Sequence, residues 1–470
     1  MNLPLLTRPA IATWSAFILR ALPLVALPVL IAQREAPAFL AFWLVLITLQ
    51  GLQLLFESSL NMSFMRSFSY AMGGADRLKI DVGPPMQTGL PPNHSILART
   101  WNTGAIIYGG MAVVTAAAVI VTGSLSAHGI AEDLGAGADP WLALFVFAAG
   151  AGLRAYGGLH LAYLYGVERI TLVRWWEATF WALAFTTASA AVSAGAGLLG
   201  VALAYQIPLA ANIFWNMWLC RKDQRARTGF TRKIGADRDI IAQLWPSIWR
   251  TGLGTFLYLG TTQGVGLYYA TIGQPAQVAA FLFAMSIIRP LSQFAQVPFF
   301  TKVPVLARLQ ASGETQAQQA IAERSMRYSY ILHASMVLAV AAMLPLLGRM
   351  QEGAAVHVPP LLWLLVGLAG YLERIGGMHL QLYSSTNHIL VHWANGVTAI
   401  AFIALATMLF PSLGVNAFPL AQAIALLAAF LPISMVNSYR AYTLPIPSFE
   451  LKTSALPLIV LLMAIVGTME

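Results

Sequence analysis

The chain has 470 residues, of which 58% are hydrophobic and 10% charged, with a net charge of +9 and a mean hydropathy of +0.69. A soluble domain carries about 25% charged residues, so this composition excludes an ordinary soluble protein. The single cysteine, Cys220, excludes an intramolecular disulfide and favours no metal or redox chemistry. We therefore expect no cofactor. The chain also has no nucleotide-binding loop motif, which argues against ATP as the direct energy source.

Apolar stretches long enough to cross a hydrocarbon core of about 30 Å recur along the chain. The first one is too long for a signal peptide and lacks a small-residue cleavage site. A thirteenth stretch, 455–467, is short, and a tilted helix, an interfacial helix and a truncated end all fit it. We predict twelve membrane-spanning helices at 10–32, 37–60, 100–122, 141–165, 173–195, 197–219, 244–270, 278–300, 328–348, 358–383, 389–410 and 416–437.

A weak internal repeat divides these helices into two halves. Residues 157–161 read Gly-Gly-Leu-His-Leu and residues 376–380 read Gly-Gly-Met-His-Leu, at the same point of two six-helix sets. The alternative explanation is a chance match. Parallel repeats place a binding site between them near the middle of the membrane. The fold class is thus an all-α polytopic membrane protein with two pseudo-symmetric lobes. Its predicted parts are an N-lobe at 1–220, a basic cytoplasmic linker at 221–243, a C-lobe at 244–437, and a cytoplasmic segment with a short apolar stretch at 438–470.

Positive charges are distributed unevenly about these helices. If the N-terminus lies in the cytoplasm, most of the 27 lysines and arginines fall in cytoplasmic segments, as the positive-inside rule requires. The outer loops carry acidic residues instead. The basic run 221–238 is better explained as an anchor for anionic membrane lipids than as a nucleic-acid site, so no nucleic-acid partner is expected.

Six arginines interrupt the apolar helices, against three glutamates at comparable depth. A charge at a helix centre in the membrane costs roughly 2.5 to 3.5 kcal/mol, so such residues usually face a cavity or a partner. Arginine also suits phosphate, because its planar fork donates two parallel hydrogen bonds. The alternative is that the arginines pair with the glutamates and hold helices together. Arg20, Arg250, Arg289 and Arg154 are the predicted diphosphate ligands; Arg174, which lies near a helix end and can reach the headgroups, and Arg374 are secondary candidates; the glutamates are Glu57, Glu177 and Glu373.

Other polar residues within the helices are secondary candidates. The repeated histidines His160 and His379 can relay protons, but a hydrogen bond across a tight Gly-Gly helix contact is the more common role. Amides and tyrosines on helices two, seven and eight are suited to contacting sugars, and equally to hydrogen bonding between helices. These residues are Gln53, Gln263, Gln293 and Tyr258.

One stretch resembles a known family. The aromatic-rich segment 42–46, then Gly51, residues 57–61 and Arg66, resembles the second helix of Wzx-type polysaccharide flippases in the multidrug/oligosaccharidyl-lipid/polysaccharide (MOP) exporter superfamily. The resemblance covers the twelve-helix, two-lobe plan, although its local motifs are loose. The short stretch 455–467 and the long loop 71–99 depart from the family's plan.

The resemblance implies a non-enzymatic flippase of the bacterial inner membrane. Such a protein would move undecaprenyl-diphosphate-linked oligosaccharide from the cytoplasmic to the periplasmic leaflet for O-antigen or exopolysaccharide synthesis. Its implied partners are that lipid, the surrounding membrane lipids and the polysaccharide polymerase machinery. The resemblance also implies a cationic central cavity, in agreement with the arginines.

Two other functions fit the same scaffold less well. A cation- or proton-coupled multidrug antiporter needs a buried, ion-binding carboxylate, and residues 10–33 contain no acidic residue and only one charge, Arg20. A membrane-embedded glycosyltransferase or polymerase needs catalytic groups at the outer face and usually a substantial outer loop, and the predicted outer loops are short. The flippase is therefore the leading hypothesis.

Overall fold

The computed structural model is described for most of the chain. The described residues are 8–72, 74, 91–135, 137–227, 230–231, 233, 235–300, 302, 306, 315–349, 357–384, 390–442 and 446–468.

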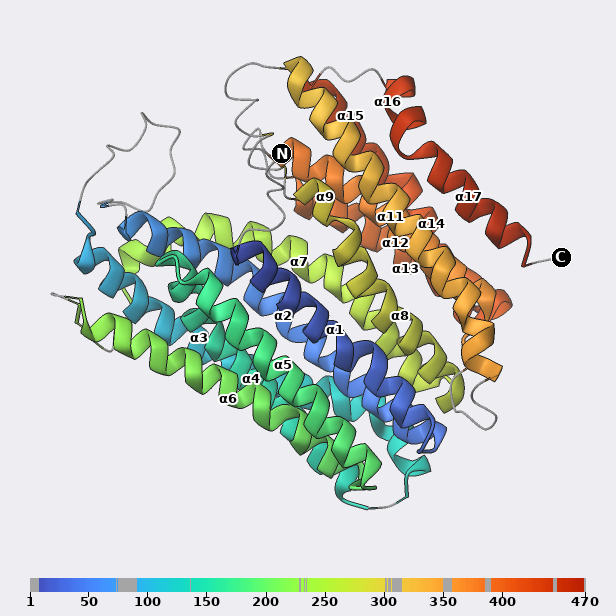
Figure 1. Cartoon of the computed structure of the whole chain (residues 1–470), viewed down its shortest axis with the longest axis horizontal. Helices are drawn as coiled ribbons and strands as arrows, with labels where there is room; N and C mark the ends of the chain where they lie inside the picture. The colour runs from blue at the N-terminus through green and yellow to red at the C-terminus, as the bar shows by residue number, and fades with distance from the viewer. Residues whose placement is uncertain are drawn as a thin grey trace. The chain divides into compact units, whose positions relative to one another are not determined.

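Within the described residues, twelve long helical segments follow the predicted spans in order, so the all-α fold class is confirmed (Figure 1). The last segment is one continuous run in which a π-helical turn, Leu426–Phe430, joins α14 to α15. The segments are α1 (Arg8–Ala32), α2 (Pro37–Met72), α3 (His94–Asp133), α4 (Asp139–Gly166), α5 (Ile170–Ser193), α6 (Gly197–Arg225), α7 (Arg238–Ile272), α8 (Pro275–Ala295), α11 (Thr315–Arg349), α12 (Pro360–Ser384), α13 (Val391–Leu413), and α14 (Ala417–Ala425) with α15 (Leu431–Tyr442).

Within the described residues, eight helical stretches are long and apolar enough to cross a membrane by length and composition. One of them, Val391–Tyr442, covers nearly all of two predicted spans, 389–410 and 416–437. The predicted spans outside this set belong to α2, α5 and α7. Helix α5 carries Arg174 and Glu177, and α7 is rich in glycine, threonine and glutamine, which lowers the hydropathy of both.

The chain forms two compact units, Met1–Leu259 and Gly260–Glu470. The boundary lies inside α7, whereas the sequence prediction begins the second lobe at residue 244. The reason is local packing, because Ile240 and Leu244 of α7 are buried in an aromatic core of the first unit together with Phe64 and Trp101. The assignment of residues to moving lobes stays a prediction.

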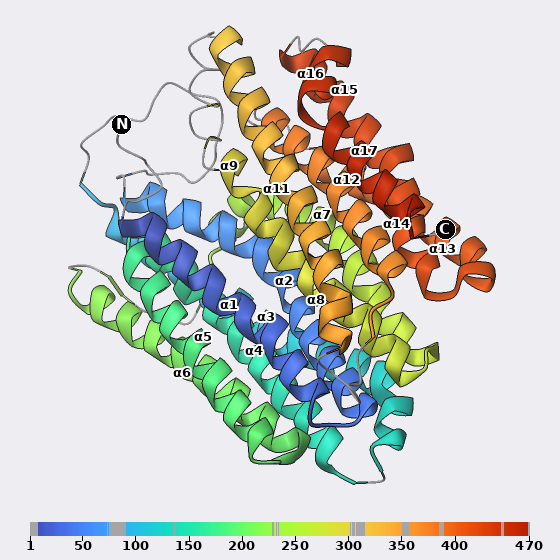
Figure 2. The same ribbon diagram turned by 45° about the vertical axis from the view of Figure 1, so that its right-hand side comes forward.

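In the first unit, α1 lies alongside α5, α4 packs against α2, α3 and α6, and α5 packs against α6 (Figures 1 and 2). Rings of Phe68, Trp101 and Tyr163 meet edge to face near one end of this bundle, with centroids 5.4 Å apart for the pairs Phe68–Tyr163 and Trp101–Tyr163. Such contacts add to the stability that burial of the rings provides.

The repeated glycine pairs lie on α4 and α12, the fourth long helix of each half. A Cβ atom on Gly157 would lie 2.9 Å from the side chain of Ile213, and one on Gly376 would lie 2.4 Å from the ring of Phe430. Both contacts are closer than real Cβ atoms allow. The two glycines therefore permit close approach of a neighbouring helix, which is how small residues act in membrane bundles.

In the second unit, α12 packs against α8, α11, α14 and α15. Two short helices follow, α16 (Ile446–Thr453) and α17 (Ala455–Val466), and both contact α11. Helix α17 also lies on α12, where the buried Tyr371 hydroxyl donates a 2.6 Å hydrogen bond to the carbonyl of Ser454. With 12 residues, α17 is roughly 18 Å long, too short to cross the hydrocarbon core upright.

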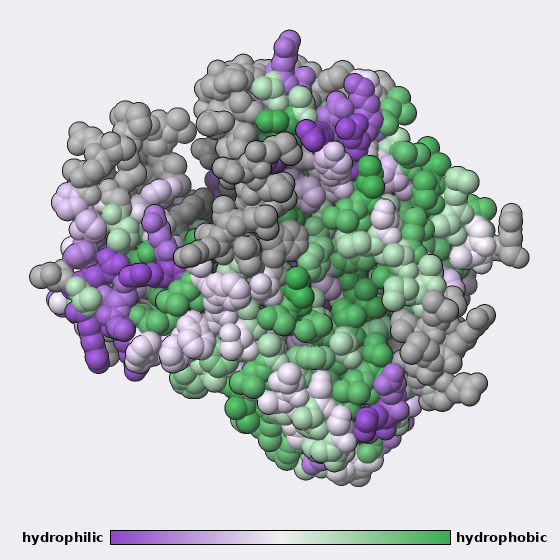
Figure 3. Space-filling view, in the orientation of Figure 1, coloured by the Kyte–Doolittle hydropathy of each residue, from purple (hydrophilic) through white to green (hydrophobic). Residues whose placement is uncertain are grey.

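The surface is apolar along the helices and polar at their ends. Figure 3 shows hydrophilic residues gathered at the end of the first unit where α3 begins and α6 ends, while hydrophobic residues cover much of the helices on this face. At that end Arg99 Nε donates a 2.5 Å hydrogen bond to Asp237 Oδ2. This hydrogen bond lowers the pKa of the Asp237 carboxyl.

Asp237 also caps α7, since its Oδ1 accepts from the amide of Asp239 at 3.0 Å. We expect Asp237→Ala to destabilise the protein by about 1 kcal/mol, the usual effect of losing such a cap. Thermal unfolding in detergent measures the effect. The matched control is Asp239→Ala, which removes an 80% exposed carboxylate 3.6 Å from Arg99 Nη2 and should leave the unfolding temperature nearly unchanged. Equal shifts in the two variants would contradict the capping role.

Candidate functional site

Three of the six arginines within the helices come together in the first unit. Arg20 of α1 lies over the ring of Trp181 on α5, and Arg174 of α5 lies over the rings of Phe17 on α1 and Tyr165 on α4. Arg154 of α4 donates a hydrogen bond to Gln206 on α6, next to Tyr205. We call Arg20, Arg154 and Arg174 the arginine cluster. It forms because α1 lies along α5 and α4 lies along α6.

Arg154 is held by a chain of amides. Its Nη1 donates a 2.5 Å hydrogen bond to Oε1 of the buried Gln206, whose Nε2 lies 3.5 Å from Gln50 Oε1. Gly150, one turn before Arg154, leaves the space for this contact, because a Cβ atom there would lie 2.6 Å from Gln206 Oε1. Gln206 is a neutral acceptor, so this hydrogen bond brings no negative charge to Arg154.

Arg20 lies among aromatic rings. Its guanidinium carbon is 5.7 Å from the centroid of the Trp181 ring, within the range of a cation–π interaction. Trp181 is in turn 6.2 Å from Tyr205, centroid to centroid, so the ring system connects Arg20 to the surroundings of Arg154. A ring stabilises a cation without neutralising it. This contact therefore brings no negative charge to Arg20.

Arg174 is the member with an acidic partner. Its Nη1 is 2.6 Å from Glu177 Oε2 on the next turn of α5, and the two side chains are only 21% and 15% exposed. Its guanidinium also faces the rings of Phe17 and Tyr165, at 5.6 and 5.3 Å from their centroids. These contacts favour the interpretation that Arg174 pairs with a glutamate over the interpretation that its side chain reaches the lipid headgroups.

The described contacts of the arginine cluster join three guanidinium groups to one carboxylate, that of Glu177. Guanidinium groups gathered in the interior of an apolar helix bundle are unfavourable unless acidic groups, a bound anion or water compensate their charge. Guanidinium groups offer paired donors that match phosphate oxygens. The arrangement is chemically suited to binding an anion with more than one negative charge.

Arg250 has different surroundings. It is exposed on α7, with its guanidinium carbon 5.7 Å from the centroid of the half-exposed Trp249 ring. The second unit contains the remaining two arginines. Arg374 of α12 donates a 2.6 Å hydrogen bond from Nη1 to Gln296 Oε1, and Arg289 of α8 is partly buried. The predicted set of six is therefore divided between two compact units.

The duplicated histidines are both buried, yet their neighbours differ. His160 is 4% exposed and packs against the rings of Trp101 and Tyr156, with centroids 5.1 and 5.4 Å away. His379 is fully buried, and its Nε2 lies 3.1 Å from Glu450 Oε1. The surroundings of His160 suit a packing role. Those of His379 include an ionisable partner.

Glu450 was absent from the acids expected inside the protein. It lies on α16, between α15 and α17, and accepts a 2.6 Å hydrogen bond from the Tyr439 hydroxyl and another from the Ser454 hydroxyl. Its side chain is 17% exposed. The sequence placed it in a cytoplasmic segment, because residues 438–454 show no long apolar run. In the sequence, Tyr439, Glu450 and Ser454 look like ordinary polar residues of a cytoplasmic segment. They come together only when α16 packs back on α12.

The amide and tyrosine candidates are dispersed. Gln263 is buried, and its Oε1 lacks a hydrogen-bond partner within the described part of the chain. Gln293 is exposed on α8 and Tyr258 is partly buried on α7. The side chain of Gln53 lies outside the described residues. Asn61 of α2, also among the polar residues of these helices, accepts a 2.7 Å hydrogen bond from Tyr108, which supports the structural interpretation at that position.

The strongest members of the site other than the arginines are Gln206, Tyr205 and Trp181, which sequence reasoning missed. Gln206 is an isolated amide in the apolar part of α6, two residues before Pro208, and that isolation is a usable signal. Tyr205 and Trp181 are indistinguishable in sequence from ordinary core aromatics. Among the described residues, no group of three histidine, cysteine or acidic side chains could hold a metal ion.

Comparisons with known proteins identify the fold. No protein-family model matches the chain, and no curated protein is similar to it in sequence. Among solved structures, the lipid II flippase MurJ in an inward closed conformation is similar with a TM-score of 0.65 and 12% identity, over 97% of this chain and 91% of that one. An inward-facing multidrug resistance MATE family transporter of the MOP superfamily gives 0.62 and 12%, over 92% and 96%.

A variant of the Vibrio cholerae MATE transporter VcmN gives a TM-score of 0.53 at 13% identity, over 93% of this chain and 95% of that one. These likenesses extend over nearly the whole chain, and the identities are too low to carry a substrate from one protein to another. The chain therefore has the fold that a lipid II flippase and the MATE transporters of the MOP superfamily share.

Proposed function

We propose that this protein is a flippase for an oligosaccharide linked to a polyprenyl diphosphate. The observation that carries the proposal is the arginine cluster, in which Arg20 and Arg154 add two positive charges to the Arg174–Glu177 pair inside an apolar bundle. A diphosphate diester carries one negative charge on each phosphoryl group, so it offers an anionic group to each of these two guanidinium groups. The fold shared with a lipid II flippase supports the same substrate class.

In this proposal the diphosphate binds the arginine cluster and the sugar lies along polar helix faces, while the prenyl chain stays in the bilayer. Rocking of two lobes exposes the bound headgroup first to one side of the membrane and then to the other, as in transporters built from repeats. The natural substrate is undecaprenyl-linked oligosaccharide for a surface polysaccharide. The protein lies in the bacterial inner membrane with its N-terminus in the cytoplasm, as its positive charges suggest.

Reconstitution tests this function directly. Liposomes that contain the purified protein and a fluorescent undecaprenyl-diphosphate oligosaccharide are treated with an external glycosidase, and the rate at which the inner-leaflet pool becomes cleavable is measured. The protein should accelerate this rate over empty liposomes by at least tenfold. A rate equal to that of empty liposomes, with and without an ion gradient, would overturn the proposal.

A proton-coupled antiporter is the second candidate, and one observation favours it besides the fold. Glu450 is a largely buried carboxylate next to His379, so the second unit contains a pair that could exchange a proton. Two other largely buried acids, Glu177 and Asp223, are engaged by Arg174 and Arg227. Efflux of a cationic dye driven by an imposed pH gradient, with no acceleration of lipid flipping, would favour the antiporter.

Gln206→Glu provides a matched probe of the arginine cluster. The new carboxylate would lie where Oε1 now accepts from Arg154, and would place a negative charge next to that guanidinium without changing the side-chain shape. We expect the unfolding temperature in detergent to rise and the flipping rate to fall by about tenfold, because a diphosphate loses one cationic partner. Gln206→Leu is the control that removes the acceptor and keeps the charge. A flipping rate unchanged in Gln206→Glu would indicate that Arg154 does not bind the substrate.

A further inference from the structure

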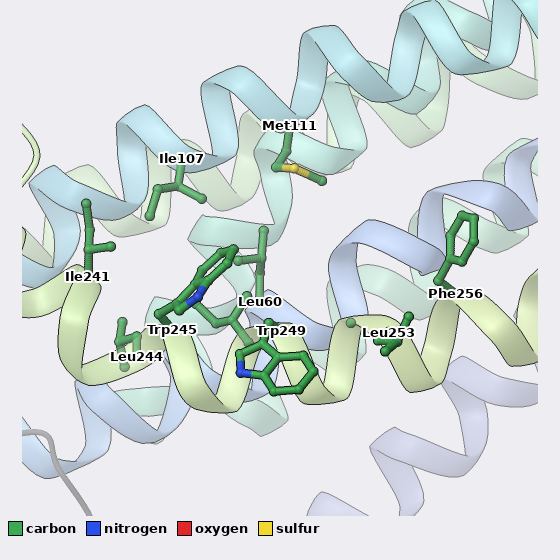
Figure 4. A pocket seen from close by; sticks show the side chains of 11 residues that line it. Leu60, Ile107, Met111, Ile241, Leu244, Trp245, Trp249, Leu253 and Phe256 are labelled. Atoms are coloured by element: carbon green, nitrogen blue, oxygen red, sulfur yellow. The ribbon is translucent and has the colours of Figure 1, made fainter. Parts of the chain in front are cut away.

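An apolar groove of about 460 Å³ lies in the first unit between α2, α3 and α7. Figure 4 shows Trp245 and Trp249 on α7 opposite Ile107 and Met111 of α3, with Leu60 of α2 between them. All the lining residues are nonpolar. Ligand pockets of this size normally include a few polar groups that orient a compact ligand, so the composition of this groove indicates a hydrocarbon occupant.

The groove is long in one direction. Its lining residues on α7 run from Ile241 to Phe256, which corresponds to roughly 22 Å along the helix axis. Large side chains remain open along this length, since Trp245 is 59% and Phe256 56% exposed. Exposed apolar residues are ordinary on a membrane protein, but a concave, elongated site is not accounted for by lipid exposure alone. Its dimensions suit a single extended chain.

A charged group borders this groove. Arg250 is exposed on the same helix, next in sequence to the lining residue Trp249, and its guanidinium carbon lies 5.7 Å from the Trp249 ring centroid. It is six residues after the predicted start of this span at residue 244, roughly 9 Å along the axis. A guanidinium at that depth needs an anionic partner, and phosphate suits its paired donors. Groove and cation together fit a phosphate joined to one hydrocarbon chain.

We infer that the groove is a capture site for the lipid-linked substrate, in which the prenyl chain lies along α7 and Arg250 contacts the adjoining phosphate. This inference rests on the proposed function. A polyprenyl phosphate has one hydrocarbon chain attached directly to its phosphate. This matches a groove with room for one chain and with Arg250 at its border. A phospholipid has two chains and ester carbonyls, for which the described lining offers no hydrogen-bond donors apart from the two indole groups. From this site the headgroup passes to the arginine cluster.

Photo-crosslinking of the full-length protein tests the inference. The probe is a polyprenyl diphosphate with a diazirine in its chain, incorporated into phosphatidylglycerol–phosphatidylethanolamine liposomes, and labelled peptides are identified by mass spectrometry. We expect label on α3 and α7 around Met111 and Phe256, and competition by unlabelled polyprenyl diphosphate but not by added phosphatidylglycerol. Equal competition by phosphatidylglycerol would show that the groove holds ordinary membrane lipid and would overturn the inference.

Two matched substitutions sharpen the result. Met111→Trp fills the groove and should lower labelling by at least fivefold, whereas Val113→Trp on the same helix, at a 71% exposed position outside the lining, should leave it unchanged. Arg250→Gln should raise the probe concentration needed for half-maximal labelling by about tenfold. Labelling that survives both Met111→Trp and Arg250→Gln would rule out the capture site.

The inference and the proposed function can fail separately. Flipping by the wild-type protein without label in the groove would leave the flippase intact and remove the capture site. Label in the groove without flipping would keep the capture site and remove the flippase. The Arg20→Ala, Arg154→Ala double variant should still label in the groove, because these arginines act after capture; loss of its label would place capture and transport in one site and contradict the inference.

Discussion

In reconstituted liposomes, the Arg20→Ala, Arg154→Ala double variant should flip the lipid-linked oligosaccharide at least a hundredfold more slowly than the wild type. A hydrogen bond to a charged group is worth about 1.5 to 3 kcal/mol, and about 1.4 kcal/mol corresponds to a factor of ten. Each arginine thus accounts for tenfold or more. Glycosidase accessibility of the substrate measures the rate, and each single variant should show a loss of at least tenfold.

The controls separate binding from folding. Arg20→Lys keeps the charge but loses the planar fork, so it should retain part of the activity. Arg34→Ala removes an exposed arginine in the α1–α2 connection whose Nη1 donates a 3.3 Å hydrogen bond to the carbonyl of Ser193, and this variant should flip at the wild-type rate. Expression and membrane insertion of the double variant should equal the wild type, since removing a charge from the membrane interior relieves an insertion cost. Full activity of the double variant would make these arginines structural.

Hydropathy predicted the helices well because membrane solvation acts on each span separately. Each predicted span overlaps a long helical segment of the structure, and the differences lie at the ends: α2, α3 and α7 extend beyond the apolar stretch, whereas the predicted span 278–300 runs past the last residue of α8, Ala295. The membrane sets the length of the apolar part, and polar residues beyond it can continue the helix in water. The division inside α7 could not be predicted, because it depends on which neighbours Ile240 and Leu244 contact.

The site was predicted less completely for a related reason. Arginines in apolar helices are visible in the sequence, but their grouping depends on how each helix is rotated about its axis. Arg174 was a secondary candidate and yet joins Arg20 and Arg154, because its face of α5 meets α1 and α4. Glu450, in contrast, was not predicted to lie inside the protein at all. A short amphipathic helix looks like a solvated segment until tertiary packing buries one of its faces.

Glu450→Ala should destabilise the second unit by about 3 kcal/mol. The carboxylate accepts from the Tyr439 and Ser454 hydroxyls and lies 3.1 Å from Nε2 of the fully buried His379. Its removal leaves these donors without an acceptor, at about 1 to 3 kcal/mol for each buried group, and breaks a buried pair. Thermal unfolding in detergent measures the effect. Glu323→Ala is the control, because Glu323 lies 3.9 Å from the exposed Lys452 and should matter little.

The pH dependence of this contribution has a definite sign. Burial raises the pKa of Glu450, but hydrogen bonds from His379, Ser454 and Tyr439, together with the charge of His379, outweigh it, so the pKa is lowered in the folded protein. A lowered pKa means that the stabilisation is present above the unfolded value of about 4.3 and is lost as the pH falls through the folded value. The difference in unfolding temperature between wild type and Glu450→Gln should therefore shrink as the pH is lowered from 6 to below about 4. A difference that grows over this range would mean that Glu450 is protonated in the folded state, and its pairing with His379 would then be a neutral hydrogen bond that holds α16 against α12.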